Sequence, residues 1–342
     1  MKIIIPMAGR GSRLRPHTLT TPKPLLPIAG KAIVRRIVED LAAGMDEKVE
    51  EVAFIIGDFG KAVEEQLQQI AQAIGARCAI YYQEQPLGPG HAVLCAAPSL
   101  EGRCLVAFAD TLFNADFHFD PREDGIIWVS KVENPSSFGV VTLGTDNFIT
   151  AFVEKPATFV SDLAIVGIYY FREGDKLRQT LQHIVEHDIR DKGEYQLTTA
   201  LGLLRAEGLR FRSAPIQEWL DCGNKNNVLA TSRRLLELKQ SRETLIAPDI
   251  TLDNAVVVPP CFIGPGAVIR NSVVGPYVCI GNNSIVEHTV ISNSIIQNNT
   301  KVRRANLHFS MLGNEVEYQG EKSEISIGDY SEYKLSALKQ TQ

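Results

Sequence analysis

A short segment near the N-terminus gathers several residues suited to holding phosphate groups. It reads IIIPMAGRGSRLRPHTLTTPKPLLPIAGK over residues 3–31 and begins as an apolar strand, followed by a loop with Gly9 and Gly11. Small residues let a ligand approach the backbone, whose amide groups can bind phosphate oxygens. Arg13 and Lys23 add positive charge in the same segment. These residues predict a binding site for a phosphorylated ligand.

Two familiar phosphate-binding motifs are absent from this loop. Leu14 occupies the position of the third glycine of the dinucleotide fingerprint, and the G-x-x-x-x-G-K-[ST] sequence does not occur. A nicotinamide-dependent oxidoreductase is therefore a weak alternative. The arrangement that does occur is a strand, then A-G-x-G-S-R-L-x-P from Ala8, then T-x-x-x-P-K-P-L-x-P, which ends at Pro27.

Further motifs follow in a fixed order along the chain. They are YYQEQPLGPGHA (81–92), FADTLF (108–113), FGVV (138–141), FVEKP (152–156) and WLDCGN (219–224). Together with the first loop, they make the sequence resemble the sugar-phosphate nucleotidylyltransferases, and within that family the long form of glucose-1-phosphate thymidylyltransferase. The resemblance extends over nearly the whole chain.

The resemblance implies an enzyme that transfers a nucleotidyl group from a nucleoside triphosphate to a sugar 1-phosphate and releases pyrophosphate. Its preferred substrates are expected to be dTTP and glucose 1-phosphate, which would give dTDP-glucose. UTP with the same sugar and GTP with mannose 1-phosphate are alternatives, and so is a non-catalytic regulatory paralogue. The resemblance also favours a homo-oligomer.

The resemblance assigns the charged residues to phosphates and to a metal ion. Arg13 matches an arginine on the departing pyrophosphate, and Lys23 and Lys155 match the lysines that hold the α-phosphate and the sugar phosphate. Asp110 and Asp221 match two carboxylates that bind Mg²⁺. Magnesium is usually held by one or two carboxylates together with substrate phosphates and water, so two aspartates from distant segments suffice.

The nucleotide and the sugar have their own expected contacts. The first loop is expected to contact the nucleotide through Ala8, Gly9, Gly11 and Ser12. The base needs an amide side chain that presents a donor and an acceptor, and Gln83 and Gln85 are both candidates. Gln85 is favoured, and the backbone around Gly88 completes the reading of a pyrimidine.

The sugar is expected to contact Gly139, Glu154 and Lys155. Gly139 matches a backbone amide that binds sugar hydroxyls in the family, and Glu154 matches an acidic residue that does the same. Asp162 departs from the family, which often has Asn at this position. A carboxylate only accepts hydrogen bonds, whereas Asn also donates, so the identity of the sugar stays open.

The elements that must position these residues suggest an α/β fold over residues 1–241. Strand-like runs alternate with helical ones, which is typical of a Rossmann-like nucleotidyltransferase domain with a mixed, mostly parallel sheet. The expected strands are KIII, VAFII, AIYY, CLVAFA, IIWVS and AIVGIYYF. Helices are expected over 33–44, 63–75, 175–187, 196–207 and 228–239. Ligands of such sheets bind beyond the carboxyl ends of the strands.

The character of the sequence changes over residues 242–342. Branched apolar residues recur every five or six positions, at Ile263, Ile269, Val274, Ile280, Val286, Ile291, Ile296, Val302, Leu307 and Leu312. This repeat predicts a hexapeptide-like, left-handed parallel β-helix. An acyltransferase would need a loop histidine as general base, and His288 and His308 are the available ones. A structural domain that supports assembly is the favoured interpretation.

Composition limits the other possibilities. The chain has 342 residues, of which 44% are hydrophobic, and a net charge of −5. This balance gives no general attraction to nucleic acid polymers or to anionic membranes. The first apolar run is too short for a signal peptide, and the six scattered cysteines favour free thiols in a cytoplasmic, reducing compartment.

Overall fold

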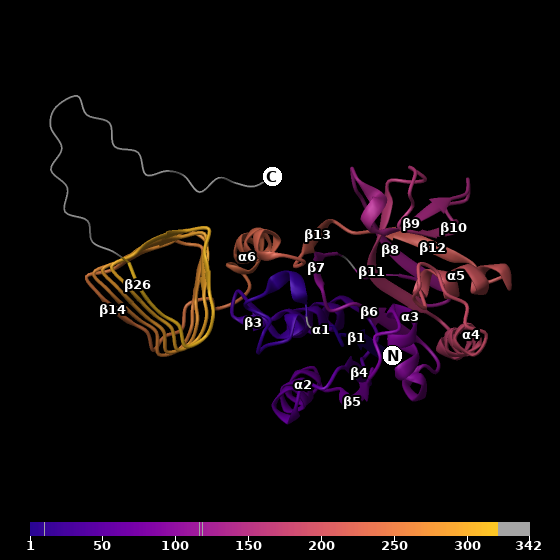
Figure 1. The fold of residues 1–342 in the computed structure, drawn as a ribbon, viewed down its shortest axis with the longest axis horizontal. Helices are drawn as coiled ribbons and strands as arrows, with labels where there is room; N and C mark the ends of the chain where they lie inside the picture. Colours follow the sequence, from indigo (N-terminus) through magenta and orange to yellow (C-terminus); the bar gives the residue numbers. More distant parts are fainter. Residues whose placement is uncertain (10, 116, 118, 321–342) are drawn as a thin grey trace.

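The computed structural model describes residues 1–9, 11–115, 117 and 119–320. Two parts lie next to each other along the long axis of the molecule: an α/β region and a stack of three-sided coils (Figure 1). The tail beyond Gly320, for which the sequence predicts no particular structure, lies outside the described residues. The predicted combination of a Rossmann-like sheet region and a C-terminal β-helix is confirmed.

A mixed sheet of nine strands forms the centre of the α/β region. Its strands are β1 (Lys2–Pro6), β4 (Glu51–Ile56), β5 (Arg77–Tyr82), β6 (Cys104–Ala107), β8 (Gly125–Lys131), β9 (Gly139–Leu143), β10 (Ile149–Glu154), β11 (Leu163–Phe171) and β12 (Phe211–Pro215). They are ordered β10-β9-β11-β6-β1-β4-β5, and β8 pairs with β11 and β12. The neighbours β6, β1, β4 and β5 are parallel, so their carboxyl ends meet at one edge.

Helices cover both faces of this sheet. They are α1 (Ile33–Gly44), α2 (Lys61–Ala73), α3 (Pro89–Cys95), α4 (Gly174–Glu186), α5 (Leu197–Ala206) and α6 (Lys225–Lys239). Side chains alternate along a strand, so Ile3 and Ile5 of β1 share a core with α1, α2 and α6, whereas Ile4 shares one with α3, α4 and α5. Among the described helices, none is long and apolar enough to cross a membrane.

Several short elements lie outside the main sheet. They are the strands β2 (Pro27–Ile28), β3 (Lys31–Ala32), β7 (Thr111–Asn114) and β13 (Glu218–Asp221), and the 3-10 helices η1 (Ser12–Leu14), η2 (Lys23–Leu25), η3 (Ala97–Ser99) and η4 (Pro135–Ser137). Strands β2 and β3 form a hairpin that follows the predicted phosphate loop, the segment of residues 7–26 between β1 and β2. Strands β7 and β13 pair with each other although about a hundred residues separate them.

The coils are three stacks of short parallel strands. Their bounds are β14 (Thr251–Asp253), β15 (Val256–Val257), β16 (Cys261–Ile263), β17 (Val268–Arg270), β18 (Val273–Val274), β19 (Val278–Ile280), β20 (Ile285–Glu287), β21 (Val290–Ser292), β22 (Ser294–Ile296), β23 (Lys301–Arg303), β24 (Asn306–His308), β25 (Met311–Leu312) and β26 (Glu317–Gln319). The aliphatic residues predicted to fill the coil core do so, although Leu312 is only partly buried.

The two parts share a packed junction. Leu245, Cys279 and Ile295 belong to the same hydrophobic core as helices α1 and α6. At the tip of the β2–β3 hairpin, Gly30 has φ +83°, and a Cβ added to it would lie 2.1 Å from the ring of Phe262 in the first coil. The coils therefore pack directly on the hairpin that follows the phosphate loop.

Candidate active site

The loop after β1 is shaped by glycine and packs against Lys23. Gly11 has φ +79°, and a Cβ there would lie 2.5 Å from the Cβ of Lys23, so a glycine is required. The Thr18 hydroxyl donates to the Gly11 carbonyl at 2.8 Å. Leu14 is buried in the core at the end of η1. These contacts hold the loop in one shape, with Arg13 exposed beside it.

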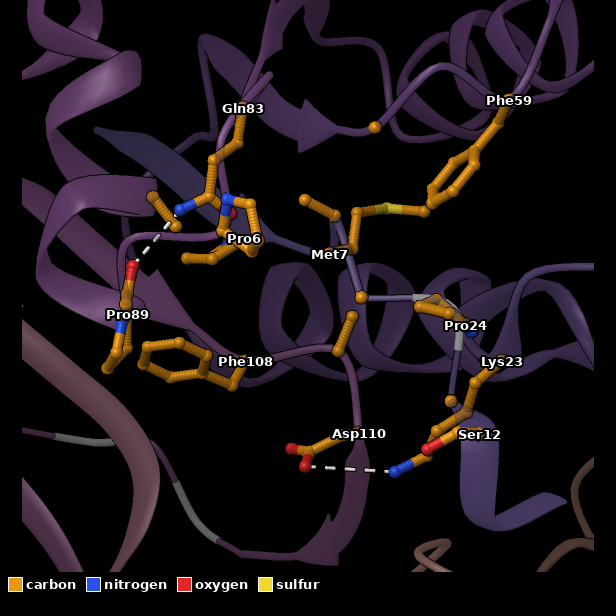
Figure 2. Close-up of a pocket in the computed structure, with 18 of the residues that line it drawn as sticks. Pro6, Met7, Ser12, Lys23, Pro24, Phe59, Gln83, Pro89, Phe108 and Asp110 are labelled. Carbon is orange, nitrogen blue, oxygen red and sulfur yellow. Dashed lines mark hydrogen bonds and ion pairs between the residues drawn. The ribbon is translucent and has the colours of Figure 1, made fainter. Parts of the chain in front are cut away.

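A cavity of about 1150 Å³ opens at the carboxyl ends of the parallel strands (Figure 2). Its walls include residues that directly follow β1, β4, β5 and β6, which is the expected place for a ligand in such a sheet. The predicted site residues in its lining are Ala8, Gly9, Gly11, Ser12, Arg13, Lys23, Gln83, Gly88 and Asp110. The sequence prediction that these segments meet in one place agrees with this geometry.

Lys23 places a buried positive charge at the cavity. Its side chain is only 8% exposed, and its Nζ lies 3.7 Å from Oδ2 of Asp110, which is 61% exposed (Figure 2). A buried ammonium group is costly unless charged or polar partners surround it. Because this ion pair is long, the lysine can take an anionic ligand as a further partner.

Asp110 and Asp221 come from distant segments and are brought together by the pairing of β7 with β13. Strand β7 begins at Thr111, directly after Asp110, and Thr111 is the register partner of Asp221. The Asp221 carboxylate accepts hydrogen bonds from the Gly223 amide at 2.8 Å and from the Asn227 side chain. Gly223 also lines the cavity, so the pair of aspartates lies at its edge.

The buried thiol of Cys222 lies beside these charges. Burial raises the pKa of Cys222 to about 12; the positive charge of Lys23 opposes this rise, and the negative charges of Asp221 and Asp110 add to it. The 3.7 Å pair of Lys23 with Asp110 and the pairing of β7 with β13 bring the one cation and the two carboxylates to the same edge of the cavity.

Gly139, Glu154 and Lys155 form a second cluster on the β9–β10 hairpin. Gly139 is the register partner of Glu154, and a Cβ on Gly139 would lie 3.0 Å from Oε2 of Glu154. This oxygen accepts a hydrogen bond from the Thr198 hydroxyl at 3.1 Å, and Oε1 lies 3.6 Å from Nζ of Lys155. Lys155 has φ +41°, an uncommon conformation for a residue other than glycine.

The second cluster adjoins the aspartate pair. Burial, and after it the negative charges of Glu154 and Asp110, raise the pKa of Tyr169. The ring of Trp219 on β13 lies 4.9 Å from that of Phe138, the neighbour of Gly139. The two clusters are thus joined through packed aromatic side chains.

Comparison with known proteins decides the family. Residues 2–237 match the family described as Nucleotidyl transferase. The chain belongs to the nucleotidyl transferase family. The matched region contains every predicted site residue and ends within α6, before the coils begin.

Relatives of this nucleotidyl transferase differ in the activities that their names describe. It is 34% identical over 241 residues to the bifunctional protein GlmU of Methanococcus maripaludis, an alignment that covers 69% of this chain and 54% of the relative. It is 30% identical over 281 residues to mannose-1-phosphate guanylyltransferase catalytic subunit beta of Danio rerio, which covers 77% of this chain and 73% of the relative. The chain spans about half the length of the GlmU proteins it matches.

A solved structure supports the fold. The Bacillus anthracis protein described as a candidate glucose-1-phosphate thymidylyltransferase, in complex with sucrose, has a TM-score of 0.59 to this chain at 21% identity. The alignment covers 71% of this chain and 96% of that one. At this identity the likeness concerns the fold and not the substrates.

The base-reading prediction is sharpened by this structure of the nucleotidyl transferase. Gln83 lines the cavity, whereas Gln85, which the sequence favoured, is exposed and is not part of the lining. The reason is that β5 ends at Tyr82, so that Gln83 is the first residue beyond the strand edge. Gln83 is therefore the better placed of the two glutamines.

Several lining residues were not predicted from the sequence. Phe59, Phe108 and Glu194 belong to the cavity wall of this nucleotidyl transferase, and so does Asp58. Asp58, Phe59 and Phe108 follow the carboxyl ends of β4 and β6, so their positions after buried strands were a usable signal. Glu194 comes from the loop before α5, and no sequence pattern pointed to it.

The carboxylates at the cavity edge are suited to a metal ion that takes few protein ligands. Among the described residues, no group of three or more His, Cys, Asp or Glu side chains could hold one. Asp110 and Asp221 supply two hard carboxylates at the edge of a cavity, and both keep oxygen lone pairs free. Such a pair fits Mg²⁺, which completes its shell with substrate phosphates and water.

The histidines considered for a second activity lie far along the coils. His288 and His308 are exposed, and Nδ1 of His308 lies 2.8 Å from the Ser292 hydroxyl. Neither histidine lines the large cavity. Their surroundings are the outer corners and edges of the coils, which gives no support to an acyltransferase centre.

Proposed function

We propose that the protein transfers a nucleotidyl group from a nucleoside triphosphate to a sugar 1-phosphate, with release of pyrophosphate. The observation that carries this proposal is the cavity wall in which the glycine-rich loop, Arg13, Lys23 and Asp110 occur together. Family membership supports the same class of reaction. The reaction joins two anions, so the site must mainly position them and neutralise their charge.

The charged residues divide this work between two substrates. The loop amides and Arg13 would bind the β- and γ-phosphates, which leave as pyrophosphate. Lys23 would hold the α-phosphate next to Asp110, because its buried ammonium lies there. Lys155 would bind the sugar phosphate whose oxygen attacks the α-phosphorus in line. Each cation lowers the repulsion between the reacting phosphates.

Magnesium would be held by Asp110 and Asp221, the two carboxylates that β7 and β13 bring together. When bound there, it would supply positive charge to the triphosphate and orient its α-phosphate. Asn227 and the Gly223 amide hold Asp221 in place for this role.

The sugar would bind on the β9–β10 side of the aspartate pair. Glu154 is held by Thr198 and lies opposite Gly139, and the absence of a side chain on Gly139 lets the Glu154 carboxylate approach its backbone closely. We propose glucose 1-phosphate as the sugar and dTTP as the nucleotide. UTP with glucose 1-phosphate and GTP with mannose 1-phosphate are the competing pairs, and the name of the Danio rerio relative makes the second a necessary comparison.

A substrate matrix tests this proposal. Purified full-length protein is mixed with Mg²⁺, each of dTTP, UTP, CTP, GTP and ATP, and glucose or mannose 1-phosphate, and released pyrophosphate is measured. The proposal predicts turnover, with the highest kcat/KM for dTTP and glucose 1-phosphate. A best rate with GTP or ATP would overturn the pyrimidine preference. Zero turnover with every pair would instead support a silent regulatory paralogue.

We also propose that the protein forms a homo-oligomer through its coils. The outer face of the β15-β18-β21 stack carries Val256, Val273 and Val290 in register, and these are 57%, 38% and 50% exposed. Apolar side chains that lie in one contiguous exposed row, unlike single scattered ones, are a feature of interaction surfaces. Sedimentation of the full chain should give an oligomer that Val273→Lys dissociates; a wild-type monomer would refute the proposal.

A cytoplasmic location is the remaining part of this proposal. All six cysteines are free thiols, and four of them are buried. Free cysteines fit a reducing compartment better than an oxidising one. Fractionation of cells that express the protein would test it, and recovery outside the cytoplasm would contradict it.

A further inference from the structure

The side chain of Gln83 is held at the cavity by two neighbours in the loop and helix that follow β5. Its Nε2 donates a hydrogen bond to the Gly88 carbonyl at 3.1 Å (Figure 2) and lies 3.2 Å from Nδ1 of His91 on α3. An amide nitrogen carries two hydrogens. Both are therefore directed at the protein, one to each neighbour.

The identity of these neighbours fixes which way the amide points. A backbone carbonyl can only accept, so the atom that faces Gly88 must be the nitrogen of Gln83 and not its oxygen. The second hydrogen then requires a lone pair on Nδ1 of His91, which places the ring proton on Nε2. Burial lowers the pKa of His91, which favours this neutral ring.

The carbonyl that anchors this arrangement cannot easily turn away. The Gly90 amide donates to the Tyr195 carbonyl at 2.7 Å, and the Tyr195 amide donates to the Leu87 carbonyl at 2.9 Å. A Cβ on Gly88 would lie 2.8 Å from Cβ of Glu194. Hydrogen bonds to Tyr195 thus hold the loop on both sides of Gly88. Only Oε1 of Gln83 remains available to a ligand.

We propose that His91 is a positioning residue for base selection, because it and the Gly88 carbonyl occupy both amide hydrogens of Gln83 and leave an acceptor alone to face the nucleotide. This inference rests on the proposed function for the meaning of the cavity. It adds His91, which lies within the YYQEQPLGPGHA motif but had no predicted role, and a chemical rule for the base.

The rule separates the bases by the atom at the centre of their pairing edge. Thymine and uracil carry N3–H and guanine carries N1–H, so each can donate to Oε1 of Gln83. Cytosine and adenine have a lone pair at the equivalent nitrogen, which would face the oxygen lone pairs without a hydrogen. A mismatch of this kind typically costs about tenfold or more in specificity.

The test compares His91→Phe with the wild type. Phenylalanine keeps a ring but cannot accept from Gln83, so one amide hydrogen becomes free to meet a base acceptor. Measured as kcat/KM for pyrophosphate release, the ratio of dTTP to CTP should fall about tenfold. Cys95→Ala is the matched control, since its thiol lies 3.9 Å from the same ring nitrogen, and it should leave the ratio unchanged.

A purely structural role would give a different result. If His91→Phe lowers kcat/KM equally for every triphosphate, the inference is wrong. Nitrogen NMR of the wild-type imidazole provides a second measurement that does not depend on a folded variant. It should show the proton on Nε2, and a proton on Nδ1 at neutral pH would overturn the inference.

Failure of the proposed function would be visible separately. The same five triphosphates are tested for binding by calorimetry with the wild type and with His91→Phe. If no pyrophosphate is released, but the wild type binds dTTP, UTP and GTP more tightly than CTP and ATP and His91→Phe loses this preference, the catalytic proposal fails and the role of His91 stands. If pyrophosphate is released but the triphosphates show no such preference, the catalytic proposal stands and the role of His91 is wrong.

Discussion

The α/β region and the coils use their residues in opposite ways. In the coils, hydrogen bonds link positions 16 or 17 residues apart, so each turn repeats the one before it and buries aliphatic side chains in a shared core. In the α/β region, the important side chains occur once each, most of them at or beyond the strand ends, and the long-range β7–β13 pair joins two of them. Repetition favours stability and an extended surface, whereas single loops on a rigid sheet supply chemistry.

The two regions are not independent where they meet at the junction. The larger hydrophobic core includes residues of the coils, and Phe262 packs on the hairpin that follows Lys23. The coils therefore support the phosphate loop as well as themselves. Variants in the active site should change activity alone, and variants in the coils should change stability alone. Variants at the junction should change both activity and stability.

The largest effect is expected for Asp110→Asn. The amide keeps the size of the side chain but removes a charge that is proposed to hold Mg²⁺, so kcat should fall by about 10³-fold. The Asp110 side chain is 61% exposed, its ion pair with Lys23 is long at 3.7 Å, and the new amide oxygen remains a polar neighbour of the buried ammonium, so the free energy of unfolding should change little. Pyrophosphate release and denaturant unfolding measure the two quantities. Asp249→Asn in the coils is the control, and an equal loss of activity there would break the comparison.

Arg13→Gln should have the next largest effect. Loss of one cation from the departing pyrophosphate typically costs about 100-fold in rate. Arg205→Gln, at an exposed position near the end of α5, is the matched control and should retain full activity. If Arg13→Gln changes KM for the sugar 1-phosphate and leaves kcat untouched, the arginine acts elsewhere.

Gly30→Ala tests the junction. Its φ of +83° and the clash with Phe262 should lower the free energy of unfolding by about 2 kcal/mol. Activity should fall too, because the hairpin follows the phosphate loop. In a Phe262→Ala background the same substitution should cost less. If Gly30→Ala lowers the free energy of unfolding equally with and without Phe262→Ala, the hairpin and the first coil do not interact at this position.

The smallest effect is expected in the coil ladder. The Arg270 and Arg303 side chains on either side of Glu287 lower the pKa of its carboxyl group. A carboxyl group whose pKa is lowered by folding stabilises the folded state at pH values above the ordinary glutamate pKa. This stabilisation is lost as the pH falls through the pKa of the folded state. Glu287→Gln should therefore cost about 1 kcal/mol of unfolding free energy at pH 7 and little at pH 3. Activity at pH 7 should be unchanged. A loss of unfolding free energy that does not depend on pH would show that ion pairing of Glu287 does not stabilise the coils.

The coils and the main helices could be predicted from the sequence because their apolar residues repeat with a clear period. Helix α1 buries Ile33, Val34, Ile37 and Leu41 as expected, and it ends at Gly44. The β9–β10 hairpin and the β7–β13 pair were missed. Their strands have little apolar periodicity, and their partners are set by tertiary packing, which a local pattern does not record.

The site could be predicted only in part, because motifs indicate residue types but not how side chains meet in the folded protein. Motifs indicated Lys23 and Asp110, which the structure brings to one cavity, and they left Gln83 as the less favoured of two candidates for reading the base. The role of His91 was not predicted, since it depends on the amide orientation of Gln83, and that orientation exists only after Gly88 and α3 are folded. Hydrogen-bond direction, unlike residue type, cannot be read from spacing.

The most direct test of the central claim, that Asp110 and Asp221 hold one divalent ion at the phosphate loop, is electron paramagnetic resonance of Mn²⁺ with a non-hydrolysable triphosphate. The wild type should bind one ion per chain together with the nucleotide, and Asp110→Asn and Asp221→Asn should each abolish that signal. If both variants bind Mn²⁺ and nucleotide as the wild type does, the two aspartates do not form a metal site.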